Sequence, residues 1–208
     1  MMEILQKGGV VMYPLLACSV CVMTIIFERI VFWMILNRRH NRQLLNEVLE
    51  FCRQGDWEMV RKKTIGSKDY AIRVLVSGIL HREFSMSKAM EVAAIEEVVK
   101  MRRGMGILDT MITIAPLLGI LGTVTGIILS FDMLAVEGIE NPQAVTGGIA
   151  QALITTAFGL TIAILAVIPF NYFNVKVEQA IQVMEQYATS LEIVYEKIVP
   201  ELDHGDPQ

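Results

Sequence analysis

Titratable side chains are missing from two long stretches of this sequence. Residues 111–131 and 146–173 contain no carboxylate, histidine, lysine or arginine. Proton relays inside a membrane usually depend on carboxylates or histidines at depth. These stretches therefore cannot relay protons through their own side chains. If ions cross a membrane here, this chain supplies walls and hydroxyl groups, and another polypeptide supplies the titrating group.

The residues of familiar enzyme and metal sites are also sparse. The three histidines, His40, His81 and His204, lie far apart and outside the apolar stretches. The sequence has no His-Glu-x-x-His pair, no glycine-rich phosphate loop and no Cys/His zinc pattern. Cys18 and Cys21 are spaced as Cys-x-x-Cys inside an apolar run, which favours two small residues of a membrane helix over a redox pair. We expect no enzymatic activity, metal, cofactor or nucleic-acid partner.

Apolar residues dominate the rest of the composition. The chain is 53% hydrophobic with a mean hydropathy of +0.49, too apolar for an ordinary soluble domain, yet its 19% of charged residues is too polar for a chain lying wholly in lipid. About 20 apolar residues suffice to cross a bilayer as a helix. Three runs exceed that length, at 10–36, 107–134 and 145–172. They predict an all-α polytopic membrane protein whose three transmembrane helices extend into a helical region outside the bilayer.

Positive charge is concentrated between the first and second runs. Residues 38–103 hold 14 of the 18 lysines and arginines, whereas residues 132–146 hold none. Because cytoplasmic loops carry the excess of basic residues, the region after the first run is expected in the cytoplasm and the N-terminus outside it. The expected regions are an outer lead (1–9), a cytoplasmic helical region (37–106), an outer connection (135–144) and a cytoplasmic C-terminal helix and tail (173–208).

Amphipathic spacing predicts the helices of the cytoplasmic region. Asp56 is placed as the N-cap of a short helix, and a further helix is expected over 69–82. Ser85 or Ser87 is expected to cap a long helix that continues straight into the second span. A last amphipathic helix is expected over 174–199, ended by Pro200, with a disordered tail after it.

Small residues recur along one face of each of the last two spans. Their steps of three and four residues place them on one helical face, and in lipid such a face brings two helix backbones close together. Thr123 and Thr156 lie on or beside these faces, and Pro116 is expected to bend its helix. The pattern indicates a pore wall or a helix-docking surface. The small residues are Ala115, Gly119, Gly122, Gly126 and Ser130, and Gly148, Ala152, Thr155, Gly159, Ala163 and Ala166.

Two motifs in residues 107–173 resemble the MotA/TolQ/ExbB proton-channel family. They are Ala-Pro-Leu-Leu-Gly-Ile-Leu-Gly-Thr-Val-Thr-Gly at 115–126 and Gly-Ile-Ala-Gln-Ala-Leu-Ile-Thr-Thr-Ala-Phe-Gly-Leu at 148–160. The expected three spans fit the ExbB and TolQ branch, because the flagellar stator branch has one more. The resemblance implies a bacterial inner-membrane ring, a homopentamer in relatives, around the helices of an ExbD- or TolR-like partner. The partner's aspartate would carry the proton, and a TonB- or TolA-like subunit would pass the motion to the outer membrane.

The same resemblance assigns roles to individual residues. Thr123 and Thr156 match the pore threonines of the family. Gln151 stands where relatives commonly carry glutamate, and its amide cannot titrate. Gln151 and Thr155 are weaker candidates for pore or partner contact. The spacing of the small residues, independently of the resemblance, predicts that Gly119, Gly122, Gly126, Gly148 and Gly159 pack the helices.

Two other interpretations stay open at the level of sequence. The threonines could merely bond the carbonyl one turn back in their own helix, as membrane threonines often do. The chain would then be an oligomeric scaffold for a partner helix, without ion conduction. A flagellar stator-type subunit is the other alternative, and it requires a fourth span.

Overall fold

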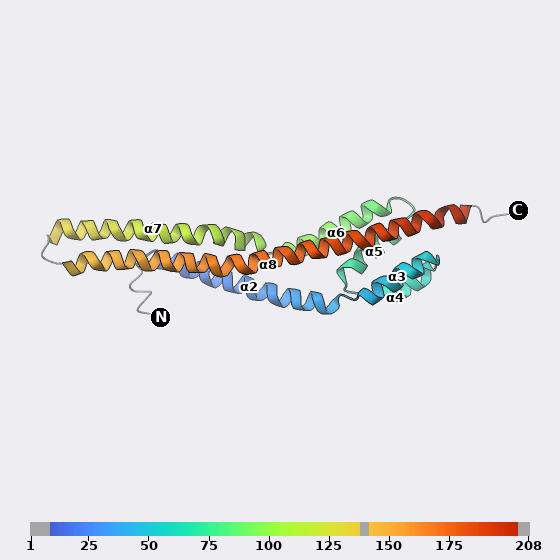
Figure 1. The fold of residues 1–208 in the computed structure, drawn as a ribbon, viewed down its shortest axis with the longest axis horizontal. Coiled ribbons are helices and arrows are strands. Elements are labelled where there is room, and N and C mark those ends of the chain that lie inside the picture. Colours follow the sequence, from blue (N-terminus) through green and yellow to red (C-terminus); the bar gives the residue numbers. More distant parts are fainter. Residues whose placement is uncertain (1–8, 138–141, 204–208) are drawn as a thin grey trace. The chain divides into compact units, whose positions relative to one another are not determined.

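The computed structural model describes residues 9–137 and 142–203, and these residues form seven helices and no strand (Figure 1). This confirms the all-α class. The helices are α2 (Met12–Arg39), α3 (Arg42–Arg53), α4 (Trp57–Thr64), α5 (Tyr70–Leu80), α6 (Met86–Arg102), α7 (Met105–Glu137) and α8 (Pro142–Asp203).

The chain divides into two compact units. The apolar unit consists of α2 as far as Ile30 together with Gly104–Phe173, and the polar unit consists of Val31–Arg103 together with α8 from Asn174 onward. Three helices are long and apolar enough to cross a membrane, over Met12–Arg39, Met105–Ala135 and Thr146–Lys197. Their number agrees with the three predicted spans.

The apolar unit is built around side chains from all three of these helices. In its core, residues of α2 meet residues of α7 and α8, because each helix carries one face of small or branched side chains. Many large apolar side chains point away from this core, among them Leu117 at 58% exposed and Leu153 at 65%. Such an exterior suits lipid or neighbouring subunits rather than water. The buried core residues are Met12, Leu15, Val22, Leu108, Ala115, Ile162 and Ala166.

The prediction that the long helix after Ser85 continues straight into the second span is wrong. Instead of running straight on, α6 ends at Arg102 and α7 begins at Met105. Gly104 between them has a φ of +78°, in the left-handed region. A glycine in that conformation just past a helix terminates it, because residues with a Cβ rarely adopt it.

The third span and the C-terminal helix are one element. In Figure 1, α8 runs without interruption from Pro142 to Asp203, so Pro200 does not end the helix as predicted. A proline removes one backbone hydrogen bond, and here it lies only three residues from the helix end. The expected outer connection is also shorter, since α7 reaches Glu137. The disordered tail is predicted over 203–208: Asp203 instead ends α8, and residues 204–208 lie outside the described residues.

Side-chain caps begin three of the short helices in the polar unit: Asn41 caps α3, Asp56 caps α4, and Asp69 caps α5. Asn41 accepts hydrogen bonds from the backbone amides of Gln43 and Leu44 at the start of α3. Asp56 accepts from the amide of Met59, which confirms it as the cap of α4. Ser85 precedes α6 but makes no side-chain capping bond.

Asp69 fastens the end of α2 to the start of α5. Its carboxylate is 1% exposed and accepts from the amide of Ala71, capping α5, and from the amide of Asn41 at 2.8 Å. His40 Nδ1 lies 3.1 Å from the same carboxylate, and its ring stacks on Tyr70. Burial raises the pKa of Tyr70 to about 12. One buried carboxylate therefore joins the α2–α3 junction to the start of α5.

Candidate functional site

The two motif-bearing helices, α7 and α8, pack at close range through their glycines (Figure 1). A Cβ added at Gly119 would lie 3.0 Å from Thr156 Cα, and one at Gly126 would lie 2.9 Å from the carbonyl oxygen of Gly148. Added at Gly159, it would collide with the carbonyl of Ala115. Each of these neighbours is backbone, which cannot move aside as a flexible side chain can. The glycines that the sequence assigned to helix packing therefore lie in one antiparallel contact.

Thr156 joins the two helices by a hydrogen bond. Its hydroxyl donates to the carbonyl oxygen of Gly119 at 2.9 Å, across 37 residues of sequence. The absence of a side chain at Gly119 allows this approach. The hydroxyl oxygen keeps lone pairs that can accept from a further donor.

Thr123 is half-buried and bonds within its own helix. Its hydroxyl donates to the carbonyl of Ile120 at 2.6 Å. This is the local bonding that the packing interpretation expects of a membrane threonine. Thr123 follows Gly119 by four residues, so it lies one helical turn after the residue of α7 that Thr156 bonds.

Thr155 lies inside the α7–α8 contact. It is 0% exposed, donates to the carbonyl of Ala152 at 2.8 Å, and its side chain fills the space that Gly122 leaves open. Within one chain it is a packing residue, with no surface to offer a partner.

Gln151 lies against the beginning of the described chain. Its amide group occupies the position that a Cβ of Gly9 would take, and Gly9 has a φ of +65°. No pattern in the sequence indicated this neighbour. The amide is half-buried and cannot titrate, so it can orient donors and acceptors but cannot carry a proton itself.

Pro116 lies inside α7, which remains helical through it. Since proline has no amide hydrogen, the carbonyl of Ile112 loses its backbone partner. The predicted bend stays a prediction.

Charged side chains lie near both ends of α7 and within α2. Asp109 and Asp132 are exposed near opposite ends of α7. Glu28 and Arg29 are adjacent on α2 but differ in burial: Arg29 is 1% exposed and Glu28 is 54% exposed, and the guanidinium donates to the carboxylate. Adjacent residues point about 100° apart on a helix, which explains why only one of the two is buried.

Comparison with known proteins shows the family to which this chain belongs. Residues 68–186 match the MotA/TolQ/ExbB proton channel family. The biopolymer transport protein ExbB-like 1 of Synechocystis sp. is 37% identical over 92% of this chain and 78% of its own length. ExbB-like 3 of the same organism is 31% identical over 98% of this chain and 96% of its own length.

The TolQ branch matches over a shorter region. The Tol-Pal system protein TolQ of Pseudomonas aeruginosa is 41% identical over 46% of this chain and 42% of its own length. With its three long apolar helices, this chain is a multi-pass membrane protein of the transport and channel type. It belongs to the MotA/TolQ/ExbB proton channel family and within it resembles the ExbB proteins.

Proposed function

We propose that this chain forms the wall of a proton channel in an inner-membrane motor complex. The motor would couple the proton motive force to outer-membrane transport or maintenance, as an ExbB–ExbD–TonB or TolQ–TolR–TolA type system. The supporting observation is a pair of threonines in a region with no titratable group of its own: Thr156 bonds the carbonyl of Gly119, and Thr123 lies one turn after that glycine on α7. Hydroxyls can order water or accept from a protonated acid but do not titrate.

The titrating group in this proposal belongs to a partner. A single-span ExbD- or TolR-like subunit supplies an aspartate, which binds and releases the proton beside the two threonines. A homo-oligomeric ring of this chain, a pentamer as in the relatives, encloses the partner's helices. The N-terminus lies outside the cytoplasm and the C-terminus inside it, because the basic region follows α2.

Proton flux in liposomes tests this proposal. Three preparations are compared: this chain alone, this chain with its ExbD- or TolR-like partner, and the same complex with the partner's aspartate neutralised. We expect flux only in the second. Absence of flux from a well-assembled complex would contradict the proposal.

Variants at one threonine then separate conduction from packing. Thr156→Val should abolish flux and Thr156→Ser should retain it. Interhelical hydrogen bonds in membranes contribute only about 0.6 kcal/mol on average, so assembly should survive the valine. Thr161→Val is the control, because Thr161 is exposed on the same helix and donates to the carbonyl of Ala157.

A scaffold without conduction is the second candidate function. The observation in its favour is that the hydroxyls of Thr123, Thr155 and Thr156 all donate to backbone carbonyls. Such a scaffold would assemble with its partner, pass no ions and tolerate valine at Thr123 and Thr156.

A further inference from the structure

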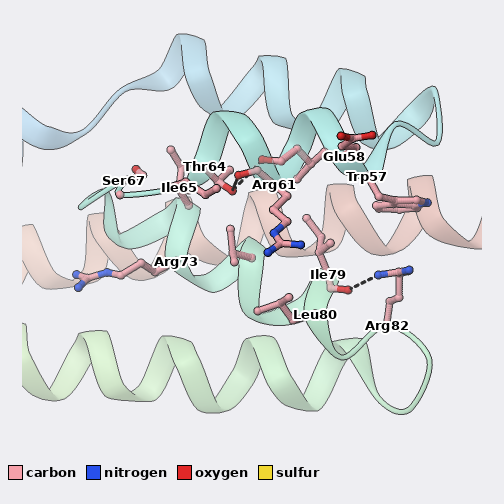
Figure 2. Close-up of a pocket in the computed structure, with 14 residues that line it drawn as sticks. Trp57, Glu58, Arg61, Thr64, Ile65, Ser67, Arg73, Ile79, Leu80 and Arg82 are labelled. Atoms are coloured by element: carbon pink, nitrogen blue, oxygen red, sulfur yellow. Dashed lines mark hydrogen bonds between the residues drawn. The ribbon is translucent and has the colours of Figure 1, made fainter.

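The polar unit contains a pocket that ion conduction through α7 and α8 does not use. It lies between α4, the loop that follows α4, and α5, and has a volume of about 690 Å³ (Figure 2). Small-molecule sites have volumes of this order. The matched family region begins at residue 68, so α4 and most of the loop precede it.

One wall of the pocket is apolar. Ile72, Val76 and Ile79 of α5 line it, and Ile79 is 6% exposed. At the rim, Ile65 is 73% exposed and Leu80 is 70% exposed. Large apolar side chains that are exposed to water beside a cavity indicate a surface that an apolar group of a ligand can cover.

The charged lining is mainly basic, with three arginines against the single carboxylate of Glu58. Two of the arginines already have partners. Arg73 donates to Glu97, and Arg82 lies over the ring of Trp57 at 5.0 Å while donating to the carbonyl of Ile79. In Figure 2 these two arginines lie at opposite ends of the pocket.

Arg61 is different from the other two. Within the part of the chain that the structure describes, its guanidinium has no ion pair and no hydrogen bond. Figure 2 shows its side chain extending from α4 toward the side of the pocket where Ile79 and Leu80 lie. A planar guanidinium can bind a carboxylate or phosphate through two parallel hydrogen bonds.

We propose that this pocket binds a small organic anion with a carboxylate or phosphate head and an apolar body. The head pairs with Arg61, and the body covers the apolar wall of α5. The arginines would repel a cation. A wholly apolar ligand would remove water from the guanidinium of Arg61 without supplying a hydrogen-bond acceptor in its place. The anion comes either from the membrane, as a lysophospholipid or fatty acid, or from the cytoplasm, as a free organic phosphate or carboxylate.

Tryptophan fluorescence tests the proposal directly. The chain has two tryptophans, so Trp33→Phe leaves Trp57, which lines the pocket, as the reporter. The full chain in phosphatidylcholine nanodiscs is titrated with hexyl phosphate. We expect a saturable change, and a much weaker response to hexanol or inorganic phosphate, because each carries only one of the two features.

Matched variants assign the response to this pocket. Arg61→Gln should weaken binding of hexyl phosphate at least tenfold, because a hydrogen bond to a charged group is lost. Lys62→Gln, the neighbouring basic residue outside the lining, should change binding less than twofold. Val76→Phe should weaken binding by filling the space, with an unchanged far-ultraviolet circular dichroism spectrum. No saturable response, or equal losses at Arg61 and Lys62, would overturn the proposal.

The lipid arm of the experiment identifies the source. Lysophosphatidate is added to the nanodiscs before hexyl phosphate. If it produces the same Trp57 response and blocks hexyl phosphate, the ligand is membrane-derived. If hexyl phosphate binds unchanged while lysophosphatidate does not, the ligand is a free anion. Ligand binding is measured without proton flux, and proton flux is measured without the ligand. Either proposal can therefore fail while the other stands.

Discussion

The buried hydroxyls of the apolar unit and the buried carboxylates of the polar unit are satisfied in different ways. In the apolar unit, buried hydroxyls donate hydrogen bonds to nearby backbone carbonyls: Ser130 donates to the carbonyl of Gly126, and Thr155 donates to that of Ala152. In the polar unit, buried carboxylates gather several donors. Asp69 joins the α2–α3 junction to the start of α5, and Glu97, 5% exposed, accepts from both Arg73 and Lys100.

This difference predicts different weaknesses. The apolar unit has backbone packed against backbone at its glycines, so added volume should damage it most. The polar unit depends on charge-assisted hydrogen bonds, so loss of a single carboxylate should damage it most. Volume and charge substitutions therefore test the comparison from both sides.

The largest effect is expected from Gly159→Ala in α8. The added methyl group collides with the carbonyl of Ala115 on α7, and backbone atoms cannot give way. Overpacking of this kind costs about 1–3 kcal/mol, and here it should also separate the two helices and impair assembly. Thermal unfolding and native gels of the purified complex measure both consequences.

Gly147→Ala is the matched control on the same helix. A Cβ at Gly147 has no neighbour within 4 Å. Because alanine favours a helix over glycine by up to about 1 kcal/mol, this variant should be neutral or slightly stabilising. Equal losses at the two glycines would contradict the close-contact description of α7 and α8.

The next largest effect is expected from Asp69→Ala in the polar unit. The substitution removes the cap of α5 and leaves the amide of Asn41 without its carboxylate. A loss of about 2 kcal/mol follows from one cap and one further hydrogen bond at about 1 kcal/mol each, below the upper end of the range expected for Gly159→Ala. Hydrogen exchange at residues 40–42 should accelerate, since the end of α2 is released from α5.

Asp56→Ala provides the comparison for that substitution. Asp56 makes one exposed capping bond, to Met59. Its removal should cost about 1 kcal/mol. If the two aspartates proved equivalent, Asp69 would be an ordinary cap and not a junction between segments.

The sequence was most informative where a pattern lies within one helix. The steps of three and four between small residues identified the packing faces of α7 and α8, and the position of Asp56 before an apolar period identified a cap. These features depend on local periodicity alone. The left-handed Gly104 was not foreseen, because the same residue type also occurs inside the apolar helices.

The features that sequence reasoning missed depend on how helices are paired. The bond from Thr156 to Gly119 requires the register of two antiparallel helices, which no spacing within either helix specifies. The pocket likewise combines Arg61 of α4 with the apolar wall of α5. Motif similarity located the threonines of the candidate site, and the structure located their hydrogen-bond partners.

The smallest effect concerns Cys52, buried in α3 among apolar neighbours. Burial raises the pKa of its thiol from 9.0 to about 12, because the thiolate is penalised by desolvation. A group held neutral in the folded state contributes stability below its unfolded pKa of 9.0 and loses that contribution as the pH rises toward 12. Between pH 6 and 8 we therefore expect no change in stability from this thiol.

Alkylation of Cys52 then reports on the polar unit alone. At pH 8 the folded protein should react with iodoacetamide far more slowly at Cys52 than the urea-unfolded chain does, because the thiolate is the reactive form. Peptide mass spectrometry separates this site from Cys18 and Cys21. In the Asp69→Ala variant Cys52 should become reactive, whereas Gly159→Ala should leave it protected if the two units respond separately to charge and to volume. Labelling of Cys52 in the glycine variant would show instead that damage to the helix contact spreads into the polar unit.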